Sequence, residues 1–89
     1  MSRTALPEEL RTEARRLLRY YSPPEAIATV DELIGLARRR HQTNRALAEV
    51  MRGMSLPREA VYWEEVAVTD DLCLQNCLAL RAMLAAHFA

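Results

Sequence analysis

The segment from residue 72 to residue 88 constrains the fold most strongly, because it is apolar on every side. Thirteen of its 17 residues are apolar, and no polar face runs along it. A helix of this kind has to be covered on all sides, whereas each helix of a three-helix monomer keeps one side in water. We therefore expect two copies of the chain to associate through this segment, unless it lines a groove for another protein's helix or belongs to a loosely packed monomer. The expected dimer interface consists of Leu74, Cys77, Leu78, Arg81, Leu84 and Phe88.

Two earlier segments carry helical periodicity and clear start signals. The second of them begins at Ser22, which is typical of an N-cap followed by early proline, and Glu25 completes a capping box. It runs for about 30 residues to Gly53, near which we expect the C-cap. The first is expected from about Pro7 to Tyr21, with one apolar face formed by Leu6, Leu10, Ala14, Leu17, Leu18 and Tyr21.

A third helix is expected to begin at Ser55-Leu56-Pro57 and to continue into residues 72–88. Thr69 and Asp70 are residues that can cap a helix, so the sequence leaves open whether this helix is interrupted there. The sequence thus predicts an all-α fold, a three-helix antiparallel bundle or hairpin with a long second helix, completed by homodimerisation. Residues 1–5 are expected to form a flexible N-terminus and residues 6–89 a single helical domain.

The middle of the second helix is expected to carry a polar layer. Arg40, His41 and Asn44 fall where its apolar series would continue. Buried polar positions of this kind can fix the register between helices.

The charges favour an antiparallel pairing of the second and third helices. Residues 38–58 carry six arginines against one glutamate, and residues 59–71 carry five acidic residues and no base. Exposed ion pairs contribute only about 0–1 kcal/mol each, but together they select one arrangement of the helices. Folding the chain back around residues 53–55 places Arg45 near Glu64 and Glu65, and residues 38–40 near Asp70 and Asp71.

Composition excludes several classes of function. The 12 basic and 12 acidic side chains cancel, which removes the net field that a nucleic acid or an anionic membrane would attract. The first nine residues lack the apolar core of a secretory signal, and polar residues interrupt the most apolar stretch before it reaches the roughly 20 residues that span a bilayer. Two cysteines cannot build a disulfide framework. We expect a cytoplasmic protein with reduced cysteines and no membrane association.

The residues capable of chemistry are few and widely spaced. Cys73 and Cys77 share one helical face, but only His41 and His87 could complete a metal site, and neither has the spacing of a zinc site. We expect the two cysteines to be small buried apolar residues, with redox sensing as the alternative. No nucleophile motif or phosphate-binding glycine loop is present. We therefore expect no enzymatic activity, no cofactor and no small-molecule substrate.

Residues 45–64 resemble a helix-turn-helix motif. The resemblance rests on Leu-Ala-Glu at 47–49, on Gly53 in the turn and on Arg-Glu-Ala-Val at 58–61. The segment departs from the family pattern because the glycine stands five residues after Ala48, where the motif has four. Its second helix also carries Glu59, Glu64 and Glu65, which would face phosphates. The resemblance implies a DNA-binding regulator, which we keep as an alternative.

Two aromatic pairs give the best functional signal. Tyr20 and Tyr21 end the first helix, and Tyr62 and Trp63 open the third. Neighbouring residues of a helix cannot both face one core, so at least one of each pair is expected at the surface as an anchor for a partner, the alternative being partial burial at the bundle ends. We expect a non-enzymatic interaction module, a regulator of the antiactivator type that binds and masks another protein such as a transcription factor. A small secretion-type chaperone is the other alternative.

Overall fold

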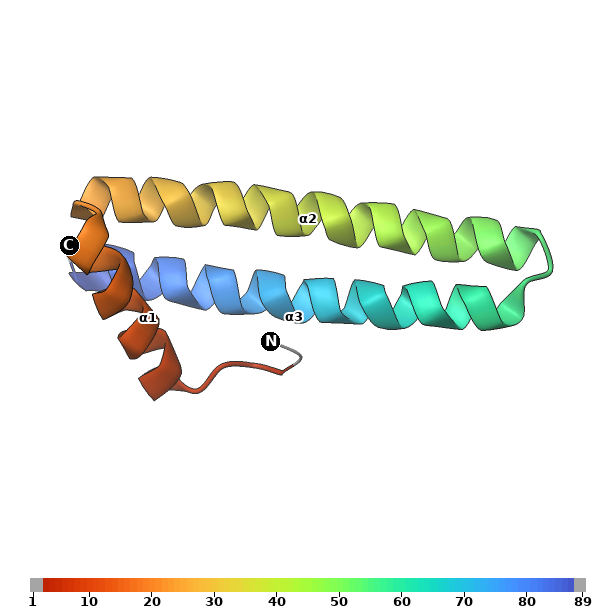
Figure 1. The fold of residues 1–89 in the computed structure, drawn as a ribbon, viewed down its shortest axis with the longest axis horizontal. Helices are drawn as coiled ribbons and strands as arrows, with labels where there is room; N and C mark the ends of the chain where they lie inside the picture. Colours follow the sequence, from red (N-terminus) through yellow and green to blue (C-terminus); the bar gives the residue numbers. More distant parts are fainter. Residues whose placement is uncertain (1–2, 88–89) are drawn as a thin grey trace.

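The computed structural model describes residues 3–87 and shows three helices joined by short connections. They are α1 (Pro7–Tyr20), α2 (Pro23–Gly53) and α3 (Pro57–His87). Helices α2 and α3 run antiparallel, side by side along their whole length, and α1 lies across one end of this hairpin (Figure 1). Within the described residues there is no strand, so the predicted all-α class and the long second helix are confirmed.

The hairpin is held along one line of inward-facing residues on each helix. On both lines the spacing alternates between three and four residues, which is the pattern of helices that wrap around each other in a coiled coil. The line on α2 consists of Val30, Ile34, Ala37, His41, Asn44, Ala48 and Met51, all buried or half-buried. The line on α3 consists of Ala60, Trp63, Ala67, Asp70, Leu74, Cys77, Arg81 and Leu84, again buried or half-buried.

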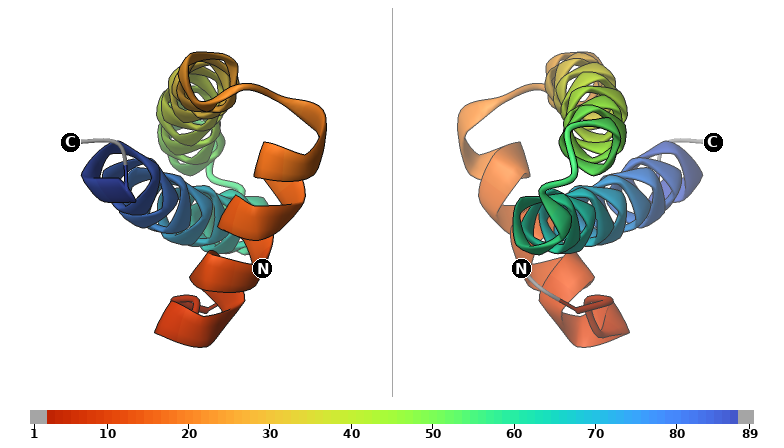
Figure 2. Two further views of the ribbon diagram at one scale, coloured as in Figure 1. Left: turned by 90° about the vertical axis from the view of Figure 1, so that its left-hand side faces the viewer. Right: turned by 90° about the vertical axis from the view of Figure 1, so that its right-hand side faces the viewer.

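Only one half of the hairpin is covered by α1. We call this the proximal half (residues 23–37 and 74–87) and the remainder the distal half (residues 38–73). In the proximal half Ala14 of α1 joins Val30, Ile34 and Leu84 in a single apolar core, and α1 packs mainly on α3 (Figure 2). The molecule is therefore elongated, 50 × 22 × 20 Å, with a radius of gyration of 15.9 Å against about 12 Å for a compact chain of this length.

The larger apolar residues between positions 74 and 84 are covered by the chain's own α1 and α2, whereas Cys73, Ala79, Ala82 and Ala86 are exposed. Leu74 and Leu78 pack on the core from the hairpin, and Leu80 and Met83 also contact it, while Leu84 is fully buried. From the sequence, each helix of a three-helix monomer was expected to leave one side in water. Here α1 and α2 both pack on the proximal half of α3, so much of the apolar surface of that half is covered without a second chain. Helix α3 is also continuous through residues 69–71, which settles the question of an interruption there.

The helix ends follow the sequence signals. The Oγ of Ser22 accepts a hydrogen bond from the Glu25 N–H (3.4 Å) and donates one to the Glu25 carboxylate (2.7 Å), which confirms the predicted N-cap of α2. At the start of α1 the Leu6 N–H donates to the carboxylate of Glu9 (3.0 Å). Glu9 also pairs with Arg3, and these bonds, that to Arg3 first, lower the pKa of Glu9.

The turn between α2 and α3 uses a serine where a glycine is common. The Leu56 N–H donates to the Met51 carbonyl (2.9 Å) and the Ser55 N–H to the Arg52 carbonyl (3.1 Å), a pairing that ends helices through a left-handed residue. That residue is Ser55, with a φ of 60°. Gly53, expected near the C-cap, is the last residue of α2 and does not adopt a positive φ.

The chain before α1 lies against α3. The side-chain amide of Asn76 accepts a hydrogen bond from the Ala5 N–H (2.7 Å) and donates one to the Arg3 carbonyl (2.9 Å). Ala5 is buried. Asn76 thus holds residues 3–5, placed by the sequence analysis in a flexible N-terminus, through two backbone contacts.

The predicted polar layer lies inside the distal half. Asn44 is buried and its Nδ2 donates to Oδ2 of the buried Asp70 (2.5 Å). The Arg40 Nε lies 3.8 Å from the other oxygen of that carboxylate, and His41 Nδ1 lies 2.9 Å from the Ala67 carbonyl. Because a carbonyl only accepts, Nδ1 of His41 carries the proton. The layer joins α2 to α3 of the same chain, and every buried side-chain nitrogen and oxygen of the described residues has a partner.

Candidate protein-interaction surfaces

Tyr62 and Trp63 form the most prominent surface feature of the distal half. Their rings meet edge to face, with centroids 5.1 Å apart and planes at 78°. Trp63 belongs to the inward line of α3 and is half-buried. Tyr62, the residue before it, faces away from this line and is 57% exposed. The expectation that one member of this pair lies at the surface agrees with this geometry.

The second aromatic pair lies at the other end of the molecule. Tyr20 is the last residue of α1 and Tyr21 follows it at the junction with α2, and both are exposed. The hairpin separates them from Tyr62 and Trp63, so the two pairs cannot belong to one binding surface (Figure 1).

Acidic residues surround Tyr62 on α3. Glu59 and Glu65 lie three residues before and after it, and residues at this spacing are neighbours on a helix. Both glutamates are exposed, and within the described chain neither takes part in an ion pair. Val66, four residues after Tyr62, is half-buried and extends the apolar surface. The exposed Arg58, four residues before Tyr62, is a third charged neighbour, so the surface is an aromatic anchor inside a rim of two acidic residues and one basic residue, which we call the acidic rim.

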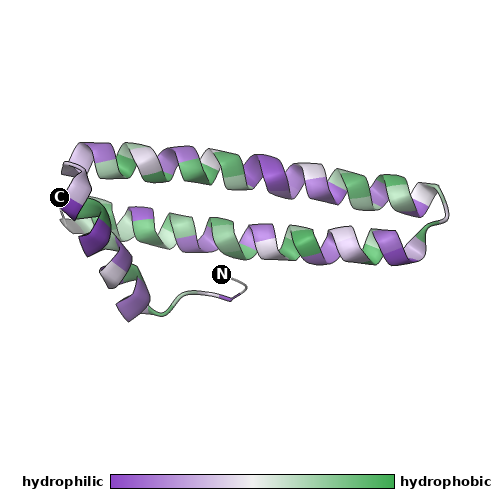
Figure 3. Cartoon of the chain, viewed as in Figure 1, coloured by the Kyte–Doolittle hydropathy of each residue, from purple (hydrophilic) through white to green (hydrophobic). Residues whose placement is uncertain are grey.

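Helix α2 carries a second apolar line beside the one that faces α3. Figure 3 shows hydrophobic segments of α2 on either side of a hydrophilic band in the middle of the helix. The apolar members are Leu33, Leu36, Leu47, Val50 and Met54, and four of them are 45%, 46%, 54% and 62% exposed in the order Leu33, Leu36, Val50 and Met54. We call these five residues the α2 stripe. The stripe is not apparent from the sequence, because stripe residues and inward residues both recur at intervals of three and four along α2.

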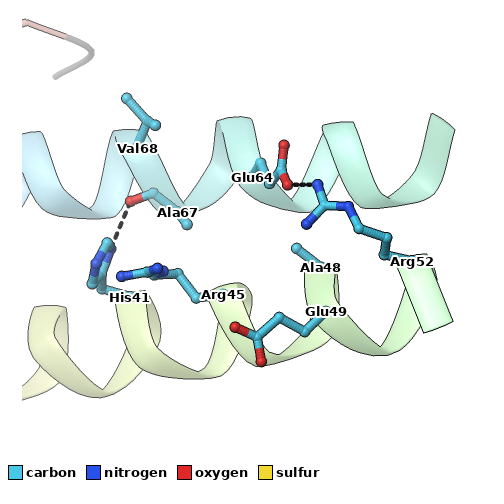
Figure 4. A pocket seen from close by; sticks show the side chains of 8 residues that line it. All are labelled: His41, Arg45, Ala48, Glu49, Arg52, Glu64, Ala67 and Val68. Carbon is cyan, nitrogen blue, oxygen red and sulfur yellow. Dashed lines mark hydrogen bonds and ion pairs between the residues drawn. The ribbon is translucent and has the colours of Figure 1, made fainter. Parts of the chain in front are cut away.

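A hollow of about 350 Å³ lies between α2 and α3 on the opposite flank of the distal half (Figure 4). His41, Arg45 and Glu49 reach it from α2, and Val68 borders it from α3. Arg52 forms an ion pair with Glu64 across the hollow. Its lining contains no serine, threonine or cysteine, and its one free carboxylate, Glu49, faces water. The hollow therefore offers charge but no hydroxyl or thiol group.

The expected ion pairs are right in kind, with one partner displaced. Arg40 pairs with Asp70, as the charge pattern predicts. Glu64 pairs with Arg52 rather than with Arg45, which lies two turns earlier on α2. Helices α2 and α3 are therefore shifted along each other relative to the register that a turn centred on residues 53–55 implies.

The cysteines are free thiols on α3. Cys73 is exposed and Cys77 half-buried, so the expectation that both are buried apolar residues is wrong for Cys73. Burial, with a smaller effect of the neighbouring Cys73, raises the pKa of the Cys77 thiol and makes it a poorer nucleophile. Among the described side chains, no group of three or more His, Cys, Asp or Glu residues is placed to hold a metal ion.

The residues expected at a dimer interface lie mostly within the chain's own packing. Leu74, Cys77 and Leu84 belong to the inward line of α3, and Leu84 has no exposed surface. Arg81 donates to Asp31 of α2 from Nε (2.5 Å). Leu78 packs on the core, and Phe88 lies outside the described residues. A dimer built on these residues stays a prediction.

The segment that resembles a helix-turn-helix has a different geometry. Helices of that motif meet at about 90–120°, so that the second enters the major groove of DNA. Here α2 and α3 run antiparallel on both sides of the turn (Figure 2). The resemblance is limited to the sequence.

Comparison with known proteins yields no relative: no family model, no curated protein and no solved structure matches the chain. Within residues 3–87, none of the helices combines the length and the apolar character needed to cross a membrane.

Proposed function

We propose that this protein is a non-enzymatic interaction module that binds another protein and masks part of its surface. The observation that carries the proposal is the Tyr62–Trp63 pair, with Tyr62 exposed in the half of the hairpin that α1 leaves uncovered. Tyrosine and tryptophan dominate binding hot spots because they offer a large contact area for few rotatable bonds. The edge-to-face contact with Trp63 fixes the Tyr62 ring before a partner arrives.

The acidic rim defines the chemistry of the partner. Glu59 and Glu65 have no cation within the described chain, so a basic partner would gain from both. A fitting ligand is an amphipathic helix with an apolar stripe for Tyr62 and Val66 and with arginine or lysine beside it. Basic surfaces of this kind are typical of nucleic-acid-binding proteins. The proposed role is therefore a cytoplasmic antiactivator that sequesters a transcription factor.

A pull-down from the source organism's lysate, with and without nuclease, tests the proposal when matched variants are compared. The tagged wild-type chain should retain a basic protein in stoichiometric amount after nuclease treatment. Tyr62→Ala should reduce binding by about 30-fold, the effect of a hot spot worth about 2 kcal/mol. Val68→Ala, equally exposed on the opposite flank, should leave binding unchanged. Circular dichroism should show the same helix content in all three proteins.

Other outcomes select the alternatives. Capture that disappears with nuclease would overturn the proposal in favour of the DNA-binding regulator. A partner that is insoluble alone and becomes soluble in the complex would indicate a secretion-type chaperone. Equal loss of binding in the two variants would show that Tyr62 is not the anchor.

A further inference from the structure

We infer that the α2 stripe is the docking site for a second copy of this chain, which packs antiparallel against the same stripe of its partner. The inference goes beyond the proposed function and does not depend on it, since the stripe lies on α2 and the aromatic pair on α3. It also differs from the interface that the sequence suggested, which the structure places mainly inside the hairpin.

The stripe has the spacing of a helix–helix seam. Its five residues, together with Arg40 and Thr43, stand at positions 33, 36, 40, 43, 47, 50 and 54, so the intervals alternate between three and four. A helix with two adjacent seams is typical of four-helix bundles, where each helix contacts two neighbours. In this chain α3 occupies the first seam. The second extends over about 32 Å and stays exposed.

The stripe is complementary to itself when one copy is reversed. Its midpoint lies between Thr43 and Asn44, so an antiparallel copy brings Leu33 opposite Met54 and Leu36 opposite Val50. The apolar ends then meet apolar ends, and Thr43 meets Thr43 at the centre. Arg40 comes opposite Leu47, which the aliphatic part of its side chain can cover while its guanidinium stays near Asp70. A two-fold dimer requires this kind of self-complementary patch.

The exposed area of the chain suits one such contact. The solvent-accessible surface is 6295 Å², whereas a compact monomer of 10.2 kDa exposes about 5300 Å². The excess of about 1000 Å² is close to the roughly 800 Å² that each partner buries in a protein–protein interface of standard size. Helix α1 packs mainly on α3 and leaves the α2 stripe free for this contact.

Sedimentation equilibrium on the full chain tests the inference. Up to about 1 mM chain, the wild type should reach a mass near twice 10.2 kDa. Leu36→Glu and Val50→Glu should each weaken association by about 100-fold, because each would bury an unpaired charge. Val61→Glu and Val68→Glu make the same change at exposed valines on the opposite flank of α3 and should remain dimeric. A monomeric wild type, or equal effects of the two pairs, would overturn the inference.

Cysteine crosslinking tests the antiparallel geometry in a Cys73→Ala, Cys77→Ala background. Thr43→Cys, next to the symmetry centre, should form a disulfide-linked dimer on mild oxidation. Leu33→Cys should crosslink to a Met54→Cys chain and not to itself. Self-crosslinking of Leu33→Cys with no mixed product would show a parallel dimer and refute the proposed arrangement.

Discussion

The proximal and distal halves of the hairpin use the same two helices but are held together by different means. In the proximal half, Val30, Ile34 and Leu84 form an apolar core that α1 completes. In the distal half the buried apolar residues of the inward lines are Ala48, Ala60 and Ala67, and the other five are the buried Asn44–Asp70 pair and the half-buried His41, Met51 and Trp63. Apolar burial stabilises in proportion to area, and a buried alanine offers less area than a buried leucine, isoleucine or valine. The proximal half is therefore expected to supply most of the stability, whereas several larger apolar side chains of the distal half, such as Val50, Tyr62 and Val68, are exposed.

The largest expected effect tests where the stability resides. Leu84→Ala should lower the free energy of unfolding by about 3 kcal/mol, because it removes buried methyl groups and leaves a cavity. Leu47→Ala, in the half-buried distal surface, should cost about 1 kcal/mol. Urea denaturation followed by circular dichroism measures both. Equal losses would contradict the proposed division between the halves.

A smaller effect is expected in the polar layer. Asn44→Ala removes the hydrogen bond to the buried Asp70 carboxylate and should cost about 2 kcal/mol. The double change Asn44→Leu with Asp70→Leu should recover this loss, because it replaces both polar partners by apolar groups. A double variant that is less stable than Asn44→Ala would show that the layer stabilises the distal half rather than fixing its register. Chemical denaturation of the three proteins makes the comparison.

The turn offers a way to strengthen the distal half. Ser55→Gly should raise the free energy of unfolding by about 1 kcal/mol, because a residue with a side chain is strained at a φ of 60°. Gly53→Ala should add a similar amount, about 1 kcal/mol, since it lies in the helix with nothing within 4 Å of the added Cβ. A thermal melt of each variant provides the measurement. Destabilisation by Ser55→Gly would mean that the serine side chain has a role beyond the turn geometry.

The smallest effect concerns a surface ion pair. Arg81 and Asp31 make two contacts, at 2.5 and 3.5 Å, and both side chains are substantially exposed. Arg81→Gln should therefore lower the free energy of unfolding only slightly, and the loss should shrink as salt is added. Unfolding at low and high ionic strength checks this. A loss that salt does not reduce would show that Arg81 stabilises the proximal half through packing.

Much of the fold could be read from local signals in the sequence. Ser22, Glu25 and the early prolines determine where helices begin through contacts within one turn, so the bounds of α1, α2 and α3 agree with expectation to within a residue or two. The polar layer and the Arg40–Asp70 pair were also predictable, because charge pattern and chain reversal together bring them close.

The parts that sequence analysis did not predict depend on packing between distant segments. The apolar residues of α3 indicate how much of the surface of this helix must be covered. They do not indicate that α1 covers part of it. The alternating series from Ala60 to Leu84 contains the necessary signal, which the surrounding apolar residues of 72–88 obscured. The α2 stripe was hidden in the same way, because Leu33 and Val30 alike fit a helical spacing and differ only in which way they face. The residue with left-handed backbone conformation is Ser55, and a serine in the sequence does not indicate a positive φ.

The arrangement of the two halves has a mechanical consequence. The free ends of the hairpin, the start of α2 and the end of α3, lie together beside the apolar core, and the turn lies at the far end (Figure 1). A force applied to these ends loads the apolar core first, so the distal half experiences no tension until the core has given way. We expect a single rupture rather than a series of small ones, because the most strongly packed part of the hairpin is loaded first.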